Sequence, residues 1–312
     1  MKKLSVVISA YNEEKKIKDL FDSLKYIDQV LEEVVFIDNA STDKTKEIAH
    51  KYTDKVITVP NNLMLNTNKN LGFSKAKTEW ILNLDADERI TPELGSEIIK
   101  VLAGESQING YWIPRKNIIF GKWIQNSIWW PDYQLRLFRR EKGKFSEKHV
   151  HEYLSVDGET EKLSEPMLHQ NYSSITQYLQ KMDKIYTEDE VKNLISTGRS
   201  FHWTESISLP IKDFLKTFFM QKGYKDGLHG LALSILQAFY AELIFLKMWE
   251  HQGFIEVNDK NFLKDVYKTS RKLGFEIRYW FLSALIDDSK GSVKKSYLRL
   301  LRKVTSRKIK NA

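Results

Sequence analysis

Three carboxylates follow directly after an apolar run in the first third of the chain. The run Trp80 to Leu84 is followed by Asp85, Asp87 and Glu88, and Thr91-Pro92 then favours a helix with proline at its first position. Asp85 and Asp87 are two residues apart, so in a turn both reach one cation, and hard oxygen ligands suit Mg²⁺ or Mn²⁺. Such an ion can in turn hold a diphosphate. An Asp-x-Asp pair also arises by chance about once in a chain of this size, so its weight depends on the surrounding elements.

The residues around this cluster alternate between strand and helix patterns. Short β-branched runs predict buried strands, and apolar residues at helical spacing predict helices between them. The predicted elements are, in order, a strand over 4–10, a helix over 17–24, strands over 34–37 and 55–59, a polar asparagine-rich loop up to Gly72, a short helix over 73–76 and a strand over 80–84. This order predicts an α/β fold with a parallel, doubly wound sheet. In such a sheet ligands bind at the carboxyl ends of the strands, where the acids lie.

Composition excludes several kinds of protein. With 312 residues, of which 42% are hydrophobic, the chain can bury a full core and is not disordered. Cysteine is absent, which excludes disulfides and thiolate metal sites and fits a reducing compartment. The first apolar run is too short for a signal peptide and is read as a strand. Ser9 to Glu13 stands where a dinucleotide-binding fold needs Gly-x-Gly-x-x-Gly, so NAD binding is not expected.

Four motifs, taken in order, resemble those of family 2 glycosyltransferases. They are Val7 to Glu13, Phe36 to Thr45, Asn70-Leu71-Gly72 and Leu82 to Glu88. The resemblance implies the GT-A fold, which is a Rossmann-like, mostly parallel sheet with flanking helices. It also implies a nucleotide-diphosphate-sugar donor, a UDP-sugar being preferred, an inverting displacement and a divalent metal, Mg²⁺ or Mn²⁺.

The resemblance also assigns roles to individual residues. The positions implied to bind the nucleotide-sugar are Ala10, Tyr11, Glu13, Asp38, Asn39, Lys69, Asn70 and Asp85. Asp87 is implied as a metal ligand, together with Asp85 and His169. Two departures stand out. Asp38-Asn39 stands where the family often has two acids, so the identity of the nucleotide base is not determined. Lys69-Asn70 stands where arginine-asparagine is common, and the lysine keeps a positive charge near the leaving diphosphate.

Later segments resemble glycosyltransferases that act on lipopolysaccharide core or lipid-linked glycans. These segments are 129–140, 149–152 and 168–172. The resemblance implies that Glu152 is the acceptor-side base; Asp132 is the alternative, although after Pro131 it can simply cap a turn. Trp129, Trp130 and Tyr133 could stack on sugar rings, or they could pack in the core. His149 and His151 share one strand face, but no third zinc ligand has a recognisable spacing.

From residue 173 the pattern becomes helical, which predicts a catalytic domain over 1–172 and a helical region over 173–312. The apolar helix 231–249 approaches membrane-spanning length, but Gln237, Glu242 and Lys247 interrupt it, so a buried or interfacial helix is favoured. The net charge is +8, and the segment 290–310 holds many Lys and Arg residues and no acid. We therefore expect a cytoplasmic protein held peripherally at the inner face of the cytoplasmic membrane by anionic lipid. The alternative is a frayed, solvated tail.

The expected function is transfer of a hexose from a nucleotide-sugar to a glycan or lipid-linked acceptor. Two rivals come from other classes. A nucleic-acid binder would use the basic tail on phosphates, but the motif set and the lack of an RNA-binding signature argue against it. A non-catalytic, membrane-tethered glycan-binding protein on the same scaffold is the other rival, and the intact Asp85, Asp87 and Glu152 argue against it.

Overall fold

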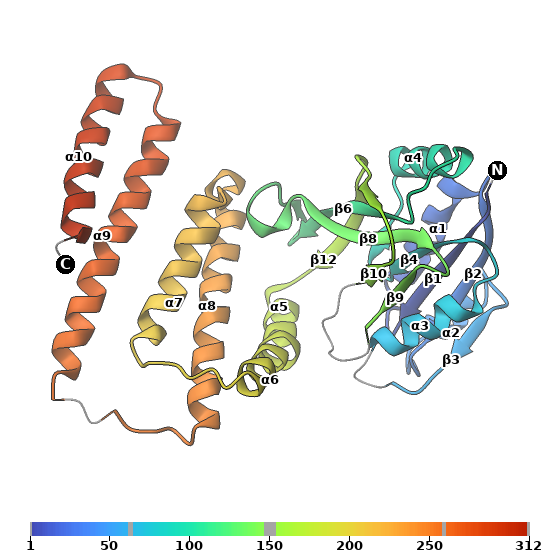
Figure 1. Ribbon diagram of the computed structural model, residues 1–312, viewed down its shortest axis with the longest axis horizontal. Coiled ribbons are helices and arrows are strands. Elements are labelled where there is room, and N and C mark those ends of the chain that lie inside the picture. Colours follow the sequence, from blue (N-terminus) through green and yellow to red (C-terminus); the bar gives the residue numbers. More distant parts are fainter. Residues whose placement is uncertain (1, 62–64, 147–153, 258–259, 311–312) are drawn as a thin grey trace. The chain divides into compact units, whose positions relative to one another are not determined.

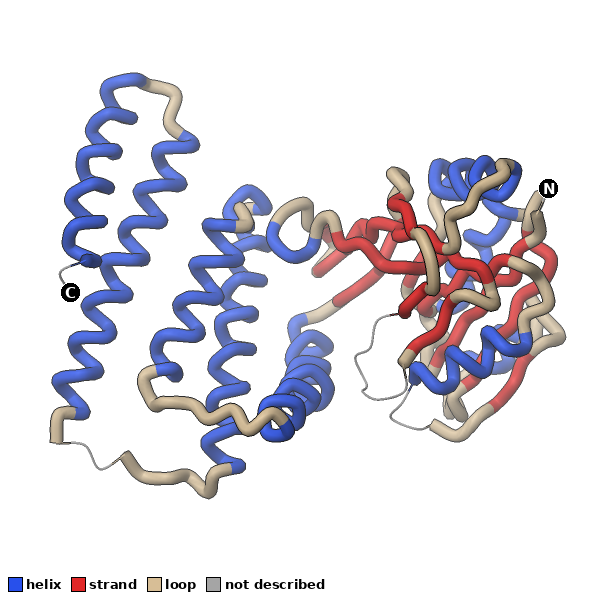
Figure 2. The backbone as a smooth tube through the Cα atoms, in the orientation of Figure 1, coloured by secondary structure: helices blue, strands red, loops and turns tan. Residues whose placement is uncertain are grey.

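The computed structural model describes residues 2–61, 65–146, 154–257 and 260–310 (Figure 1). The chain divides into two compact units. The sheet unit comprises Met1–Ile124 and Trp129–Ser173, and the helical unit comprises Gln125–Ile128 and Ser174–Ala312. Figure 2 shows that the strands of the described chain lie in the first unit and that the second is built from helices.

The sheet unit alternates strands and helices along its first half. Its elements are β1 Leu4–Ala10, α1 Ile17–Ser23, η1 Leu24–Ile27, β2 Leu31–Asp38, α2 Thr45–Ala49, β3 Val56–Thr58, α3 Leu65–Lys75, β4 Trp80–Asp85, β5 Glu88–Arg89, α4 Pro92–Ala103, β6 Gly110–Ile119, β7 Lys122–Trp123, β8 Asp132–Arg139, β9 Gly143–Phe145, β10 Leu154–Val156, β11 Thr160–Lys162 and β12 Met167–Tyr172. The short helix η2 Ser127–Trp129 is divided between the two units. The main sheet has the order β3-β2-β1-β4-β8-β6-β12-β5. Strands β1 to β4 are parallel, and β8 is antiparallel to both β4 and β6.

Both faces of the sheet are covered, as the continuous apolar runs predict. On β4, Trp80, Leu82 and Leu84 pack with α1 and α4, whereas Ile81 packs with α3 on the other face. Figure 1 shows the ribbons of α3 and α4 on opposite sides of the strands. Helix α3 lies so close to β1 that a Cβ added at Gly72 would be 2.5 Å from Val7 Cγ1. Glycine at this position therefore lets α3 approach the sheet and brings its side chains to the carboxyl end of β4.

The predicted start of α4 is confirmed. The side chain of Thr91 caps the helix by accepting a hydrogen bond from the Leu94 N–H at 3.1 Å, and Pro92 is the first helical residue. This cap ends the turn that carries the acidic cluster. The cluster therefore lies between the end of one buried strand and the start of one capped helix.

The prediction of a loop up to Gly72 was wrong. Helix α3 already begins at Leu65, within the asparagine-rich segment, because tertiary contacts stabilise it: the Asn68 amide, for example, is buried and donates to Asn39 Oδ1. Asparagine has a low helix propensity, and such contacts can override it. Helix α7 begins at Glu205 and contains Pro210.

The helical unit consists of antiparallel helices and short irregular turns. Its elements are α5 Ile175–Lys181, a π-helical stretch η3 Met182–Thr187, α6 Glu188–Ser196, α7 Glu205–Phe214 continuing into η4 Leu215–Met220, η5 Gly223–Asp226, α8 Leu228–His251, α9 Phe262–Asp288 and α10 Ser292–Lys310. The segment Gln125–Ile128 belongs here because Asp226 accepts hydrogen bonds from the Gln125 N–H and from the Asn126 amide. Among the described residues, α8 is the one helix long and apolar enough to cross a membrane.

Candidate active site

The carboxyl ends of β1 and β2 are joined by a buried amide. Asn39 is completely buried and donates to Ser9 Oγ at 2.9 Å and to Ala10 O at 2.8 Å. Asp38, also buried, accepts a hydrogen bond from the Ser41 N–H through Oδ1, while its Oδ2 has no partner among the described residues. Asn39 therefore holds the strands together, and Asp38 has one oxygen that lacks a donor.

The loops after β1 and β2 are bonded to each other. Asn12 accepts a hydrogen bond from the Thr42 N–H at 2.8 Å, and the Glu13 N–H donates to Thr45 Oγ1 at 2.7 Å. Tyr11, at the tip of the first loop, is 42% exposed. These bonds fix the loops that carry the predicted nucleotide-binding residues and leave the Tyr11 ring accessible to a ligand.

Asp85, at the end of β4, is held between two cations. Lys69 Nζ on α3 lies 2.6 Å from Asp85 Oδ1, and Asp85 Oδ2 accepts a hydrogen bond from Arg136 on β8. Burial on its own raises the pKa of Asp85, but the charges of Arg136 and Lys69 hold that pKa far below its ordinary value. Asp85 is therefore ionised at physiological pH, and a cation already contacts each of its oxygens.

Glu88, on β5, anchors the arginine. Its side chain is fully buried, and it accepts from Arg136 Nη2 at 2.7 Å and from the Asp85 backbone N–H at 3.0 Å. Burial lowers the pKa of Arg136, but Asp85 and Glu88 together raise it above its ordinary value. Glu88 thus holds Asp85 twice, through the backbone of Asp85 and through the shared arginine.

Asp132, the alternative base, is surrounded by donors at the start of β8. Its Oδ2 accepts from Arg115 Nε at 2.8 Å and from Asn117 Nδ2 at 3.1 Å, and its Oδ1 accepts from Gln134 Nε2 at 2.9 Å. Burial raises the pKa of Asp132, but Arg115 and these hydrogen bonds lower it below its ordinary value. Because a general base works best with a pKa near the working pH, these contacts disfavour Asp132 as the base.

Asp87 lies in the turn after β4 and faces His169 on β12. Asp87 Oδ1 is 3.5 Å from His169 Nε2, and Asp87 Oδ2 is 3.6 Å from Lys16 Nζ. The Gln170 N–H donates to Asp87 O at 2.8 Å, which ties this turn to β12. Burial raises the pKa of Asp87, but His169 and Lys16 outweigh it and lower that pKa to about 2. The turn therefore places an ionised carboxylate beside an imidazole nitrogen.

The pair formed by Asp87 and His169 fits a divalent cation. Neighbouring ligands of an octahedral ion with bonds of about 2.1 Å are roughly 3 Å apart, and the two side chains are separated by 3.5 Å. An imidazole ligand favours Mn²⁺ over the harder Mg²⁺. The described residues contain no group of three or more His, Cys, Asp or Glu side chains arranged for a metal. Water and a bound diphosphate would supply the remaining ligands, as is usual for such ions.

Asn70 and the aromatic residues make contacts within the protein. Asn70 exchanges two hydrogen bonds of 2.9 Å with the backbone of Phe145 and so holds α3 to β9. Each of the three aromatic residues predicted either to stack on sugars or to pack is half-buried and already contacts another side chain. The pairs are Trp129 with Tyr172, Trp130 with Trp123, and Tyr133 with Lys162.

Some residues that the sequence predicted for the site lie outside the part of the chain that the structure describes. Conversely, the structure places in the site several residues that the sequence analysis did not name. Glu152, His149 and His151 belong to the first group. The second group consists of Lys16, Arg115, Asn117 and Arg136, which surround the three aspartates. One sequence pattern could have identified Arg136. Asp132, Gln134 and Arg136 alternate along one strand, so their polar side chains share one face of a central strand.

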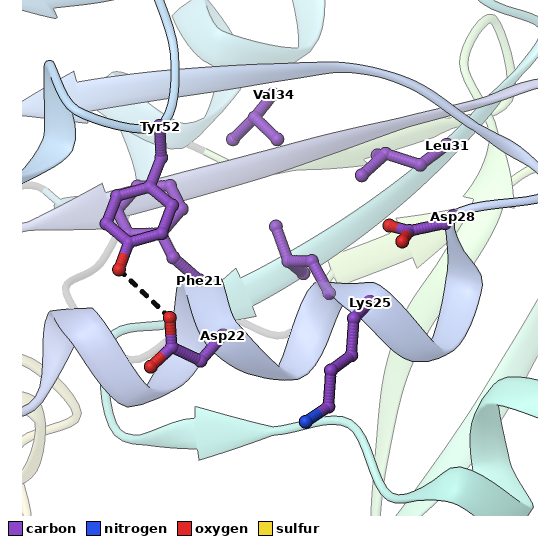
Figure 3. Close-up of a pocket in the computed structure, with 8 residues that line it drawn as sticks. Phe21, Asp22, Lys25, Asp28, Leu31, Val34 and Tyr52 are labelled. Atoms are coloured by element: carbon purple, nitrogen blue, oxygen red, sulfur yellow. Dashed lines mark hydrogen bonds between the residues drawn. The ribbon is translucent and has the colours of Figure 1, made fainter.

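A separate hollow of about 500 Å³ lies near the amino end of β2 (Figure 3). The Tyr52 ring stacks on Phe21 at 4.5 Å between centroids, and its hydroxyl donates to Asp22 at 2.9 Å. Leu31 and Val34 line the hollow from the first half of the strand, whereas Asp38 ends that strand. The hollow contains none of the predicted site residues, and its stacked rings contribute to packing.

Comparison with known proteins relates this chain to glycosyltransferases. The model of the family described as glycosyl transferase family 2 matches residues 5–154. An uncharacterized glycosyltransferase of Rickettsia typhi is 29% identical over 261 residues, covering 80% of this chain and 88% of the relative. The lipopolysaccharide core biosynthesis glycosyltransferase LpsC of Rhizobium meliloti is 25% identical over 258 residues, covering 80% and 93%. The mannosyltransferase PcManGT from Pyrobaculum calidifontis, solved with GDP-Man and Mn²⁺, aligns with a TM-score of 0.46 and 13% identity over 98% of this chain and 84% of that chain.

The fold, the site and the sequence relatives agree on one family. The mixed sheet carries its acids at the carboxyl end of β4, and the four motifs that resemble the family lie within or next to the matched residues. Residues 5–154 match family 2 glycosyltransferases, the sheet unit has the GT-A fold, and the protein is a glycosyltransferase.

Proposed function

We propose that the protein transfers a sugar from a nucleotide-diphosphate-sugar to a hydroxyl group of a glycan acceptor, with inversion at the sugar carbon. The observation that carries this proposal is the pairing of Asp87 with His169, 3.5 Å apart, beside the lysine-bound Asp85. A carboxylate and an imidazole suited to a divalent ion thus lie next to the ion pair of Asp85 and Lys69 at one edge of the sheet. A leaving diphosphate needs such an arrangement.

Asp38 supports binding of the donor's nucleotide at the ends of β1 and β2. Its buried Oδ2 lacks a hydrogen-bond donor within the described residues, and an unmatched buried acceptor is costly. The imino group of a base or a ribose hydroxyl would supply the donor. Uracil offers one such N–H, which is why a UDP-sugar is the first donor to test.

Lys16, Lys69 and Asp85 give the sugar-diphosphate portion its electrostatic environment. Lys16 Nζ lies 3.6 Å from Asp87 and Lys69 Nζ lies 2.6 Å from Asp85, so cations flank the acidic turn. A divalent ion held by Asp87 and His169 would neutralise charge on the leaving diphosphate. The two lysines add to this stabilisation, and Asp85, oriented by Lys69 and Arg136, accepts hydrogen bonds from ribose or sugar hydroxyls.

The proton of the acceptor hydroxyl needs a base on the opposite face of the sugar ring. Asp132 is engaged by Arg115, Asn117 and Gln134, and its lowered pKa makes it a weak base. Glu152 therefore remains our candidate for the base. Once it takes the proton, the acceptor oxygen attacks the sugar carbon as the bond to the diphosphate breaks.

We further propose a lipopolysaccharide core or lipid-linked saccharide as the acceptor, used at the inner face of the cytoplasmic membrane. The similarity to LpsC supports the acceptor class. The helical unit supports membrane contact, because α10 exposes an apolar stripe: Val293 is 85% exposed, Tyr297 61% and Leu300 60%. Lys and Arg side chains flank this stripe, and α10 has no acid. In this proposal the sheet unit performs transfer and the helical unit docks on anionic lipid.

A panel of nucleotide-sugars tests the proposal. The full chain is incubated with each donor and Mn²⁺, and the melting temperature and the release of free nucleotide are measured. A true donor raises the melting temperature in proportion to its affinity, and nucleotide release reports transfer or slow hydrolysis. The non-catalytic alternative predicts binding without release. If no donor binds in the presence of Mn²⁺, the proposal is wrong.

A further inference from the structure

Asn117 lies at the centre of the site, between two of its functional side chains. It is completely buried on β6, and its Cα is paired with that of His169 on the parallel neighbour β12. Arg115, two residues earlier on the same face of β6, is paired with Asp132 on β8. The register therefore places His169 directly opposite Asn117 on one side and Asp132 diagonally across from it on the other.

The contacts of Asn117 fix the orientation of its amide. Its Nδ2 lies 2.9 Å from the backbone O of Trp129 and 3.1 Å from Asp132 Oδ2. A carbonyl and an ionised carboxylate only accept hydrogen bonds, so the NH₂ group must face them. A flipped amide would place oxygen against oxygen at both contacts. The Asn117 Oδ1 is consequently directed toward β12, where the Asn171 Nδ2 also lies 3.4 Å from it.

The orientation of Asn117 then determines where the proton of His169 lies. His169 Nδ1 is 2.6 Å from Asn117 Oδ1, and because this oxygen can only accept, Nδ1 must carry a hydrogen. In a neutral ring the lone pair is then on Nε2. This is the nitrogen that lies 3.5 Å from Asp87 Oδ1.

We propose that Asn117 is a positioning residue that holds His169 in the tautomer with a free Nε2, ready to bind a divalent cation together with Asp87. Asp132 and Arg115 act on His169 indirectly, through Asn117. Arg115 keeps Asp132 ionised, and the ionised Asp132 keeps the Asn117 amide from flipping. This gives Asp132 a function other than that of the base. The inference rests on the proposed function, since it takes the cation to bind at Asp87.

The tautomer can be observed directly in the wild-type chain. The full chain, with ¹⁵N-labelled histidine and without metal, is studied by long-range ¹H–¹⁵N correlation at rising pH until the ¹⁵N shifts are those of neutral rings. His169→Gln identifies the His169 signals among those of the 7 histidines. We expect the pattern of a ring protonated at Nδ1. A ring protonated at Nε2 overturns the inference.

Metal affinity supplies the second readout. The binding of Mn²⁺ alone is measured by electron paramagnetic resonance on the free protein and on Asn117→Leu. Loss of an outer partner of a metal-bound histidine weakens binding by about 10- to 100-fold, and we expect at least a tenfold loss. The matched control is Asn171→Ala, which removes a buried asparagine on the other side of the same oxygen and should bind Mn²⁺ like the wild type.

The outcomes separate the inference from the proposed function. If Asp87→Ala binds Mn²⁺ as tightly as the wild type, the cation is not at Asp87 and the proposed metal site is wrong, whatever the tautomer. If Asp87→Ala loses Mn²⁺ but a folded Asn117→Leu keeps it at wild-type affinity, the metal site stands and the role of Asn117 is wrong.

Discussion

Lys69 Nζ and Asp85 Oδ1 lie 2.6 Å apart, so the first acid after the strand is paired with a cation of the protein itself. Arg136 holds the other oxygen of Asp85, and the pKa of Asp85 is accordingly held far below its usual range. Asp87, two residues later, faces an imidazole instead. The two acids of the motif therefore have different partners, and we propose different tasks for them: Asp85 accepts hydrogen bonds from the donor, and Asp87 binds the metal.

The first prediction concerns this division of tasks. Asp87→Ala should abolish transfer and Mn²⁺-dependent donor binding, because it removes a metal ligand from a turn while leaving the core intact. Asp85→Ala should also lower transfer severely, but the free protein should still bind Mn²⁺. Turnover and Mn²⁺ titration of both variants check this. Near-normal turnover of Asp87→Ala in the presence of a chelator would contradict our assignment of the motif.

The second prediction concerns the base. Glu152→Gln should lower turnover by about 10²-fold or more while donor affinity is kept, since a base acts after binding. Asp132→Asn should act differently: its loss of charge releases Arg115 and the amide of Asn117, so Mn²⁺ affinity should fall along with turnover. Donor affinity, Mn²⁺ affinity and turnover are measured for both. If Asp132→Asn loses turnover alone and Glu152→Gln loses nothing, the base is Asp132.

Much of the sheet could be predicted because its signals are local. Residues 4–10 and 80–84 form continuous apolar runs, and the structure has β1 and β4 there. Thr91 and Pro92 predicted the start of α4 from two adjacent residue types. The asparagine-rich segment misled because its helix depends on partners far along the chain, such as Asn39, which accepts a hydrogen bond from Asn68.

The surroundings of the predicted acids could not be predicted, because they depend on strand register. Asn117 meets His169 only because β6 and β12 pair in parallel with these residues opposite each other. Arg136 meets Glu88 across an interval of 48 residues, through a hydrogen bond between fully or nearly buried side chains. A single sequence gives the face of a strand on which a residue lies, but it does not give the neighbouring strand or its register.

The third prediction concerns the buried charges around Arg136. Arg136→Met should destabilise the sheet unit by about 3–5 kcal/mol, because it leaves Asp85 and fully buried Glu88 without their shared counter-ion. The expected result is a clear fall in melting temperature by calorimetry. Arg136→Met combined with Glu88→Gln should recover part of the loss, since it removes one of the two carboxylates that shared the arginine. Equal melting temperatures for wild type and Arg136→Met would show that this network contributes nothing to stability.

The fourth prediction concerns acid. The pKa of Asp87 is lowered to about 2 in the folded protein, whereas an aspartate in an unfolded chain titrates near 3.9. The folded state thus binds fewer protons than the unfolded state in this window, so stability rises with pH there. About 2 kcal/mol should be present above pH ~4 and be lost as the pH falls to ~2. Urea unfolding at several pH values should show this slope, and Asp87→Asn should show a shallower one.

The fifth prediction concerns the exposed face of α10. One face of this helix packs on α9 through Leu298, which meets Leu282 and Ile286. A second apolar face is exposed, and its residues follow the i, i+4, i+7, i+11 spacing of one stripe; they are Val293, Tyr297, Leu300 and Val304. A tail that was merely solvated would not need a second apolar stripe. We therefore expect this stripe to enter the headgroup region of an anionic bilayer while the flanking cations contact lipid phosphates.

Liposome co-sedimentation across a salt series checks the role of α10. The full chain should bind vesicles that contain anionic lipid, bind neutral vesicles weakly, and be released by salt, because exposed charges are screened. Val293→Ser with Leu300→Ser should weaken binding at every salt concentration, since it removes apolar area but no charge. Lys303→Gln with Arg307→Gln should instead reduce the dependence on salt and on anionic lipid. A chain that ends at Asp288 should lose most of its binding yet keep activity on a soluble acceptor, because the acids that we assign to transfer all lie in the sheet unit. Equal sedimentation of the truncated and full chains would show that α10 is not the anchor.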